Sequence, residues 1–256
     1  MIRAALLAVL ALAPASAGAS APSRPLALTA APARLVLLGS GADTVRIRNP
    51  GTKRIAVDVS RAGFALDLRG RPRIVGRRSP RSAARWLTVR PAHLKLAPHG
   101  AARLHVSATV PRRAEPGDHD ALILLSTRPL ASARVSVRLR LGVVVVVRAP
   151  GAVVRRLKLG RLGVARRAGM QALELVVVND GNATERLLHV RTVVSPQPAR
   201  RHIATVVASA RELRPHTRGL LEFSLRTRAH GPVTAQVVVP AEPGRPVIRR
   251  MYRIRL

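Results

Sequence analysis

Apolar and polar residues alternate along most of this chain of 256 residues. An apolar residue at every second position places one face of a strand against a core and the other face in water. Helical spacing of apolar residues is absent beyond the first twenty residues, so the pattern predicts strands nearly everywhere. The clearest alternation falls at residues 45–48, 55–59, 104–110, 135–141, 221–225 and 252–256.

Turn-forming residues separate the predicted strands. Glycine, proline, asparagine and aspartate favour the tight turns that join antiparallel strands. Short strands joined in this way are typical of a β-sandwich rather than of an α/β fold. The strongest turn signals are Asn49-Pro50-Gly51, Pro98-His99-Gly100, Pro116-Gly117-Asp118, Asn179-Asp180-Gly181 and Pro243-Gly244.

The two halves of the chain resemble each other. A strand that ends in Asn49-Pro50-Gly51 recurs as a strand that ends in Asn179-Asp180-Gly181. Later in each half, residues 94–100 have a counterpart in residues 213–219. Two landmarks in the same order indicate two homologous domains of normal size. The alternative is that turn chemistry repeats by chance in a β-rich chain.

A domain boundary is predicted at residues 148–151, after the strongest β run in the chain. The sequence therefore predicts an all-β fold with two tandem immunoglobulin-like β-sandwiches. The first occupies residues 22–149 and the second occupies residues 152–256.

The first twenty residues have the order of a secretory signal peptide. Arg3 precedes an uncharged apolar run at residues 4–13, which Pro14 ends. Small residues suited to cleavage follow at residues 15–19, so residues 1–19 are predicted to be removed. An N-terminal membrane anchor is the alternative, but it needs an apolar run of roughly 20 residues.

The rest of the chain contains no run of 18 apolar residues. No transmembrane segment is therefore predicted in the mature chain. The signal peptide places the protein outside the cytoplasm, either at the cell surface or secreted.

The amino-acid composition excludes several classes of functional site and makes the protein strongly basic. The chain has no cysteine, which excludes disulfide scaffolds, cysteine nucleophiles and cysteine-ligated metal centres. It has 45 Lys and Arg residues against 12 Asp and Glu residues, a formal net charge of +33. Only three of the basic residues are lysine, so part of this charge is explained by the codon bias of a GC-rich genome.

One segment concentrates arginine without any acidic residue. If it forms a loop, it presents a cationic surface to phosphate or carboxylate polymers, which the planar guanidinium binds well. The alternative is a solvated loop in an arginine-biased chain. Specific nucleic-acid binding is not expected, because four aromatic residues are too few for base stacking. The predicted polymer-binding residues are Arg69, Arg71, Arg73, Arg77, Arg78, Arg81 and Arg85.

Catalytic motifs are absent from the sequence. Asp118, His119 and Asp120 form the densest acidic and imidazole cluster. On a strand His119 would point away from the two carboxylates, and the preceding Pro116-Gly117 already explains Asp118 as a turn residue. No nucleophile elbow, phosphate loop or zinc-binding helix motif occurs. The sequence predicts no enzyme, no cofactor and no metal.

The strand predicted at residues 134–147 allows two interpretations. Val143, Val145 and Val147 belong to an uncharged β-branched run at its end. If both edges of this strand are paired, it only closes the first sandwich. If one edge is free, it is a template for pairing with another chain.

Several motifs resemble the first domain of WxL-interacting cell-surface proteins. These are residues 86–91, the strand and turn at residues 94–100, Val110-Pro111, and Pro116-Gly117-Asp118. The similarity covers residues 43–151, with His119 where that family has an aromatic residue. It implies two immunoglobulin-like domains, the first of them peptidoglycan-binding. A weaker similarity to periplasmic pilus chaperones rests on the tandem sandwiches and the long alternating strand.

These observations predict an exported, non-catalytic protein of the cell envelope. Its expected partner is peptidoglycan, an anionic wall polymer or a surface protein. The alternative is a periplasmic-chaperone-like protein that assists assembly of an exported subunit by strand addition.

Overall fold

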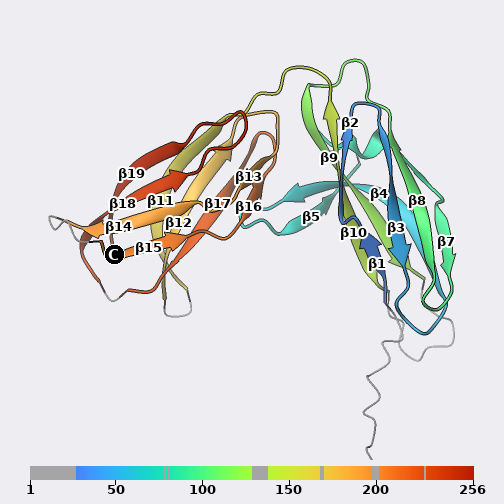
Figure 1. Cartoon of the computed structure of the whole chain (residues 1–256), viewed down its shortest axis with the longest axis horizontal. Helices are drawn as coiled ribbons and strands as arrows, with labels where there is room; N and C mark the ends of the chain where they lie inside the picture. Colours follow the sequence, from blue (N-terminus) through green and yellow to red (C-terminus); the bar gives the residue numbers. More distant parts are fainter. Residues whose placement is uncertain are drawn as a thin grey trace, which may run out of the picture.

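A computed structural model describes residues 27–77, 79, 81–128, 138–167, 170–197, 202–227 and 229–256. The predicted signal peptide lies outside the described residues. In the described part, the chain forms strands β1 to β19 and one short 3₁₀ helix, η1 (Ala83–Arg85). The predicted all-β fold of two immunoglobulin-like sandwiches is confirmed (Figure 1).

Two sheets form the first sandwich. The four-stranded sheet has the order β1-β3-β8-β6, and the larger sheet has the order β2-β10-β9-β4-β5, with β7 paired to β4. Only β2 and β10 pair in parallel. The strands are β1 (Thr29–Ala31), β2 (Arg34–Leu38), β3 (Ala42–Arg48), β4 (Ile55–Leu66), β5 (Pro72–Val75), β6 (Leu87–Arg90), β7 (His93–Leu96), β8 (Ala101–Ala108), β9 (Gly117–Thr127) and β10 (Arg140–Ala149).

The second sandwich has a comparable arrangement. A sheet of order β11-β12-β17 and a sheet of order β15-β14-β18-β19 enclose its core, and β13 pairs with β16 at the end nearer the first sandwich (Figure 1). The strands are β11 (Leu157–Arg167), β12 (Met170–Asn179), β13 (Glu185–Leu187), β14 (Arg191–Pro196), β15 (Ala204–Val207), β16 (Arg211–Leu213), β17 (Thr217–Leu225), β18 (Pro232–Val239) and β19 (Ile248–Arg255).

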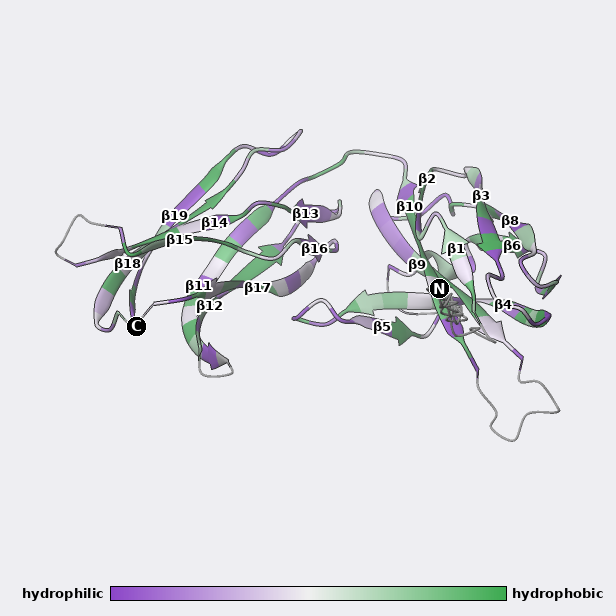
Figure 2. Ribbon diagram, turned by 60° about the horizontal axis from the view of Figure 1, so that its bottom comes forward, coloured by the Kyte–Doolittle hydropathy of each residue, from purple (hydrophilic) through white to green (hydrophobic). Residues whose placement is uncertain are grey.

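Alternation along each strand builds the two cores. In β3, Val45 and Ile47 are fully buried while Arg46 and Arg48 are exposed. The same alternation appears as bands of hydrophilic and hydrophobic colour along the strands in Figure 2. The two hydrophobic clusters are separate, one within residues 28–147 and the other within residues 157–256. Burial of apolar side chains stabilises each sandwich without any disulfide, since the chain has no cysteine.

The paired landmarks of the two halves have the same geometry. Asn49 is fully buried, donates its amide to the carbonyl oxygens of Lys53 and Ala97, and accepts from the backbone of Gly51. Asn179 is also fully buried and makes the equivalent bonds to Ala183, Leu213 and Gly181. The following turns match as well, since His99 and His216 both have a φ near +55°. Each asparagine therefore joins two loops at one end of its sandwich.

Asp118 lies in a strand rather than in the predicted turn at residues 116–118. Asp118, His119 and Asp120 all lie in β9. His119 points into the core, where its ring packs against Trp86 with the centroids 4.4 Å apart and the ring planes tilted by 49°. The two carboxylates point outward, so strand alternation separates them from the imidazole. Among the described residues, no three histidine or acidic side chains gather as a metal site.

The described part of the chain contains no helix with the length and apolar character that crossing a membrane requires.

Replacing either buried asparagine by alanine should destabilise its own sandwich. Each substitution leaves two carbonyl groups and one amide without their partner, and an unpaired buried polar group costs about 1–3 kcal/mol. We expect Asn49→Ala and Asn179→Ala each to lower the free energy of unfolding by about 2–4 kcal/mol in chemical denaturation. Gln197→Ala is the control, because this amide is exposed. An equally small effect at all three positions would contradict the role of the buried asparagines.

Candidate functional site

Strand β10 is paired along its whole length on one side only. It runs antiparallel to β9 from Arg140 to Ala149. On its other side β2 pairs with Val144 to Arg148. Val143, Val145 and Val147 are fully buried, with their side chains in the core of the first sandwich. The predicted strand-pairing residues thus use their side chains to hold this sandwich together.

The first four residues of β10 have a different environment. Among the described residues, no strand pairs with residues 140–143 on the side away from β9. The backbone N–H of Val144 donates to Ala33 across that edge, at 3.1 Å. Because hydrogen-bonding direction alternates along a strand, the N–H and C=O groups of Arg140 and Gly142 face the same way. This four-residue segment is a short free edge.

The path of the N-terminal chain explains why the edge is free. Strand β1 belongs to the four-stranded sheet, whereas β2 belongs to the larger sheet. The chain crosses between the sheets at Pro32 and Ala33 and reaches β10 only at Val144. The free edge therefore begins where the crossing ends.

The outer face beside this edge is partly apolar. Val36 is 51% exposed and Leu38 is 70% exposed on β2. Leu124 and Val144 are half-buried on the neighbouring strands. A side chain at Gly142 would place its Cβ 3.0 Å from Leu122, so glycine lets Leu122 lie over β10. Leu124, opposite Gly142, and Val144 therefore border the free edge, whereas Val36 and Leu38 lie further along β2, opposite Val146 and Arg148.

Charged groups join the two sandwiches at the end of this face. Asp118 accepts two bonds from Arg148, the shorter at 2.6 Å, and a third from the backbone of Thr184 in the second sandwich. Burial is the largest single influence on the pKa of Asp118, and it raises that pKa. The bonds from Arg148 and Thr184 together outweigh burial, so the pKa of Asp118 is lowered. The carboxylate of Asp118 thus ties the two sandwiches together in its ionised form.

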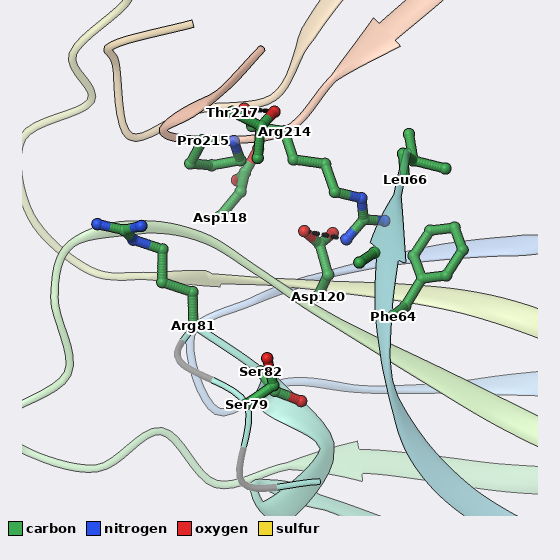
Figure 3. A pocket seen from close by; sticks show the side chains of 11 residues that line it. Phe64, Leu66, Ser79, Arg81, Ser82, Asp118, Asp120, Arg214, Pro215 and Thr217 are labelled. Atoms are coloured by element: carbon green, nitrogen blue, oxygen red, sulfur yellow. Dashed lines mark hydrogen bonds and ion pairs between the residues drawn. The ribbon is translucent and has the colours of Figure 1, made fainter. Parts of the chain in front are cut away.

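Asp120 forms a buried ion pair across the same interface. Its carboxylate contacts the guanidinium of Arg214, which lies 3.9 Å above the ring of Phe64 (Figure 3). Both charged residues are less than 7% exposed. Burial raises the pKa of Asp120 to about 7, assisted by the negative charges of Glu212 and Asp118 and opposed by Arg214 and Arg34. The pair borders a cavity of about 140 Å³ between the sandwiches.

A hairpin makes the second bridge between the sandwiches. The tip between β4 and β5 reaches the second sandwich in both ribbon views (Figures 1 and 2). Arg69 at this tip forms ion pairs with Glu174 at 3.0 Å and Glu222 at 3.3 Å. The carbonyl of Leu68 accepts a hydrogen bond from the backbone of Leu220 on β17. The hairpin therefore docks against the edge of a sheet in the other sandwich.

The seven predicted polymer-binding arginines do not form one free loop. Arg69 pairs with acidic residues of the second sandwich, and Arg81 pairs with Glu115 at 3.4 Å. Arg77 donates to the carbonyl of Arg61. Arg71 and Arg73 lie at and in β5, Arg85 is exposed at the end of η1, and Arg78 is outside the described residues. Polymer binding by these residues stays a prediction.

The ion pairs between the two sandwiches could not be predicted from the sequence. Asp120 was recognised as part of a dense cluster, but its partner Arg214 lies 94 residues later in a turn motif. Arg34 and Glu212, which pair at 2.5 Å across the same interface, are 178 residues apart. Nothing in a single sequence connects such positions.

The chain resembles known proteins in fold, as seen by comparison with solved structures. No family model and no curated protein matches the chain. The resemblance to WxL-interacting proteins therefore finds no support.

The structural neighbours are pilus chaperones. The Salmonella enterica SafB chaperone in complex with SafA pilin has a TM-score of 0.50 at 12% identity, covering 90% of this chain and 97% of that chain. The CsuC–CsuE chaperone–tip subunit complex of Acinetobacter baumannii has a TM-score of 0.50 at 13% identity, covering 87% and 97%. The chaperone–tip adhesin complex of CFA/I fimbriae has the same TM-score at 10% identity, covering 88% and 98%. The shared fold extends over both sandwiches.

The stability conferred at Asp120 should depend on pH. Burial raises the pKa of this group from 3.8 to about 7, so the folded protein retains a proton that the unfolded chain releases. Stability from this group is complete below about pH 4 and is lost as pH rises towards 7. We expect the thermal midpoint of Asp120→Asn, relative to wild type, to rise between pH 4 and pH 7. Asp43→Asn on β3 is the control for the loss of a carboxylate at an exposed position. If the difference in thermal midpoint between Asp120→Asn and wild type is constant with pH, the raised pKa of Asp120 is refuted.

Loss of the hairpin contact should change domain orientation more than stability. Arg69 is partly exposed, and such ion pairs contribute about 1 kcal/mol or less. We expect Arg69→Ala to broaden the distribution of distances between the sandwiches in small-angle X-ray scattering, with a nearly unchanged thermal midpoint. Arg73→Ala on the same hairpin is the matched control. Identical scattering from both variants would show that Arg69 does not fix the orientation.

Proposed function

We propose that the protein assists assembly of an exported subunit by pairing residues 140–143 of β10 with a strand of that subunit. The observation that carries the proposal is the short free edge in an otherwise fully paired strand. The N–H and C=O groups of Arg140 and Gly142 are available to extend the sheet by a strand of the partner. The role is non-catalytic and extracytoplasmic.

The environment of the edge favours an apolar partner strand. Leu124, opposite Gly142, and Val144 supply half-buried apolar surface beside it. Val36 and Leu38 continue this apolar surface along β2 towards the domain interface. A subunit strand placed here would cover this surface while its backbone pairs with β10. An exported subunit that lacks one strand of its own sheet has both the open edge and the exposed core that this surface complements.

The fold likeness supports this role over a general envelope-binding protein. Three neighbours with a TM-score of 0.50 come from structures of chaperones in complex with a pilin or a tip subunit. They share tandem sandwiches with this chain across nearly its whole described length. The identity of 10–13% establishes the fold, so the activity rests on the free edge and its test.

A proline at the free edge should abolish capture of the subunit. Arg140→Pro removes a backbone N–H that faces away from β9, whereas Arg140→Ala keeps that N–H and removes only the side chain. We expect tagged wild type and Arg140→Ala to retain the same exported protein from periplasmic extracts, identified by mass spectrometry, and Arg140→Pro to lose it. Far-UV circular dichroism and the thermal midpoint verify that Arg140→Pro is folded.

Val145→Pro is not suitable for this test. Val145 is fully buried and pairs with Ala121, so proline there would disrupt the sandwich itself. Hydrogen exchange provides a second measurement, because a bound subunit should slow exchange of the Arg140 and Gly142 amides. Equal capture by wild type and Arg140→Pro would refute strand addition at this edge.

A further inference from the structure

The outer face of the four-stranded sheet in the first sandwich is strongly basic. Inward and outward side chains alternate along β1, β3, β8 and β6, and the inward ones are buried or half-buried except for the exposed Asp43 on β3. The remaining outward positions hold only alanine, serine or threonine. We call this surface the basic face, and its exposed basic residues are Arg46, Arg48, Arg90, Arg103 and His105.

Strand register brings these basic side chains together. Arg46 lies directly opposite Arg103 on the neighbouring strand, and His105 lies opposite Arg90. Directly opposed side chains in an antiparallel pair have Cβ atoms about 5 Å apart. Like charges directly opposite each other destabilise a sheet, so the Arg46–Arg103 pair has a cost that the free protein does not recover. Such a cost is recovered when an anion binds between the strands.

The ion pairs found in the described residues leave the basic face uncompensated. They involve carboxylates on β4, on β9, at the domain interface and in the second sandwich. Asp43 is the nearest acidic residue along β3. It is in register with the buried Val106, which places it on the other side of the pleat, and its carboxylate accepts the N–H of Thr44. The cations of the basic face therefore remain available to a ligand.

The spacing and chemistry of the face fit a chain of phosphate groups. Arg46 and Arg48 are two residues apart on one strand, a separation of about 7 Å. Guanidinium groups bind phosphate oxygens through two parallel N–H donors, and the interspersed threonine hydroxyls add further donors. A flat sheet presents these groups in rows along an extended polymer. We propose that the basic face binds a linear phosphate polymer of the cell envelope.

The composition of the face argues against two other phosphate-bearing partners. A lipid bilayer is held most firmly when apolar side chains insert beside the cations, and the face has no large apolar residue among its described positions. Single-stranded nucleic acid binds by stacking bases on aromatic side chains, and none is present there. A base-free polymer needs only the cations and hydroxyls.

The basic face and the free edge of β10 belong to opposite sheets of the same sandwich. A subunit paired with β10 would leave the basic face uncovered. The two activities are therefore separable by mutation, and polymer binding does not depend on the proposed strand addition.

Titration with long-chain inorganic polyphosphate tests the inference on the full mature chain. We expect the triple variant Arg46→Ser, Arg48→Ser, Arg103→Ser to bind at least about tenfold more weakly at 0.1 M salt. The slope of log affinity against log salt should fall by about two, since each phosphate neutralised on a single chain contributes about 0.7. The matched variant Arg249→Ser, Arg253→Ser, Arg255→Ser on β19 removes the same charge and should change the affinity by less than about twofold.

Stability provides an independent readout on the same residues. Arg103→Thr removes the repulsion with Arg46, so its thermal midpoint should equal or exceed that of wild type while polyphosphate binding weakens. Arg140→Pro should bind polyphosphate as wild type does, which separates this test from that of strand addition.

Four results would overturn the inference. Equal loss of affinity in the two triple variants would mean that net charge alone attracts the polymer. Undiminished binding by the first variant would place the site elsewhere. Tighter binding of oligothymidine, or of phosphatidylglycerol vesicles, through the same three arginines would assign the face to nucleic acid or to a membrane surface.

Discussion

The arrangement of the two sandwiches depends on the outward carboxylates of one strand. Asp118 and Asp120 alternate on β9 with side chains that build the first core, and both reach groups of the second sandwich. Burial at the contact between Asp120 and Arg214 raises the pKa of the carboxyl, so the protonation state of this buried group is coupled to the domain interface. One strand thus holds a core on its inner face and a domain interface on its outer face.

This division explains where a partner can bind. The interface occupies the end of the outer face next to Asp118 and Asp120, and there β2 also covers β10. The opposite end of β10 has neither cover, and there the free backbone groups lie beside the half-buried Leu124. The hairpin tip at Arg69 is ion-paired with the second sandwich, while Arg140 and Gly142 remain exposed. A rigid, partly open face suits the addition of a strand from another chain.

Much of the fold could be predicted from the sequence, because strand periodicity and turn chemistry are local. The matched landmarks at Asn49 and Asn179 correspond to the same buried hydrogen bonds in both sandwiches. The site could be predicted only in part. The free edge depends on where β2 joins β10, and the interface depends on partners as distant as Asp120 and Arg214. The ion pairs of the arginine-rich segment could not be predicted for the same reason: Arg69 appears unopposed in sequence, yet its acidic partners lie more than 100 residues away.

A local surplus of arginine is therefore a weak guide to binding, and the decisive quantity is which cations the fold leaves uncompensated. Arg69 and Arg81 come from the densest arginine segment and are ion-paired. Arg46 and Arg103 come from two ordinary alternating strands, 57 residues apart, and register places them side by side. Folding brings the charges of Arg46 and Arg103 together into a repulsive patch, whereas it neutralises the charges of Arg69 and Arg81. An anionic ligand gains most where folding has left such repulsion in place, because binding then removes an existing penalty as well as forming new contacts.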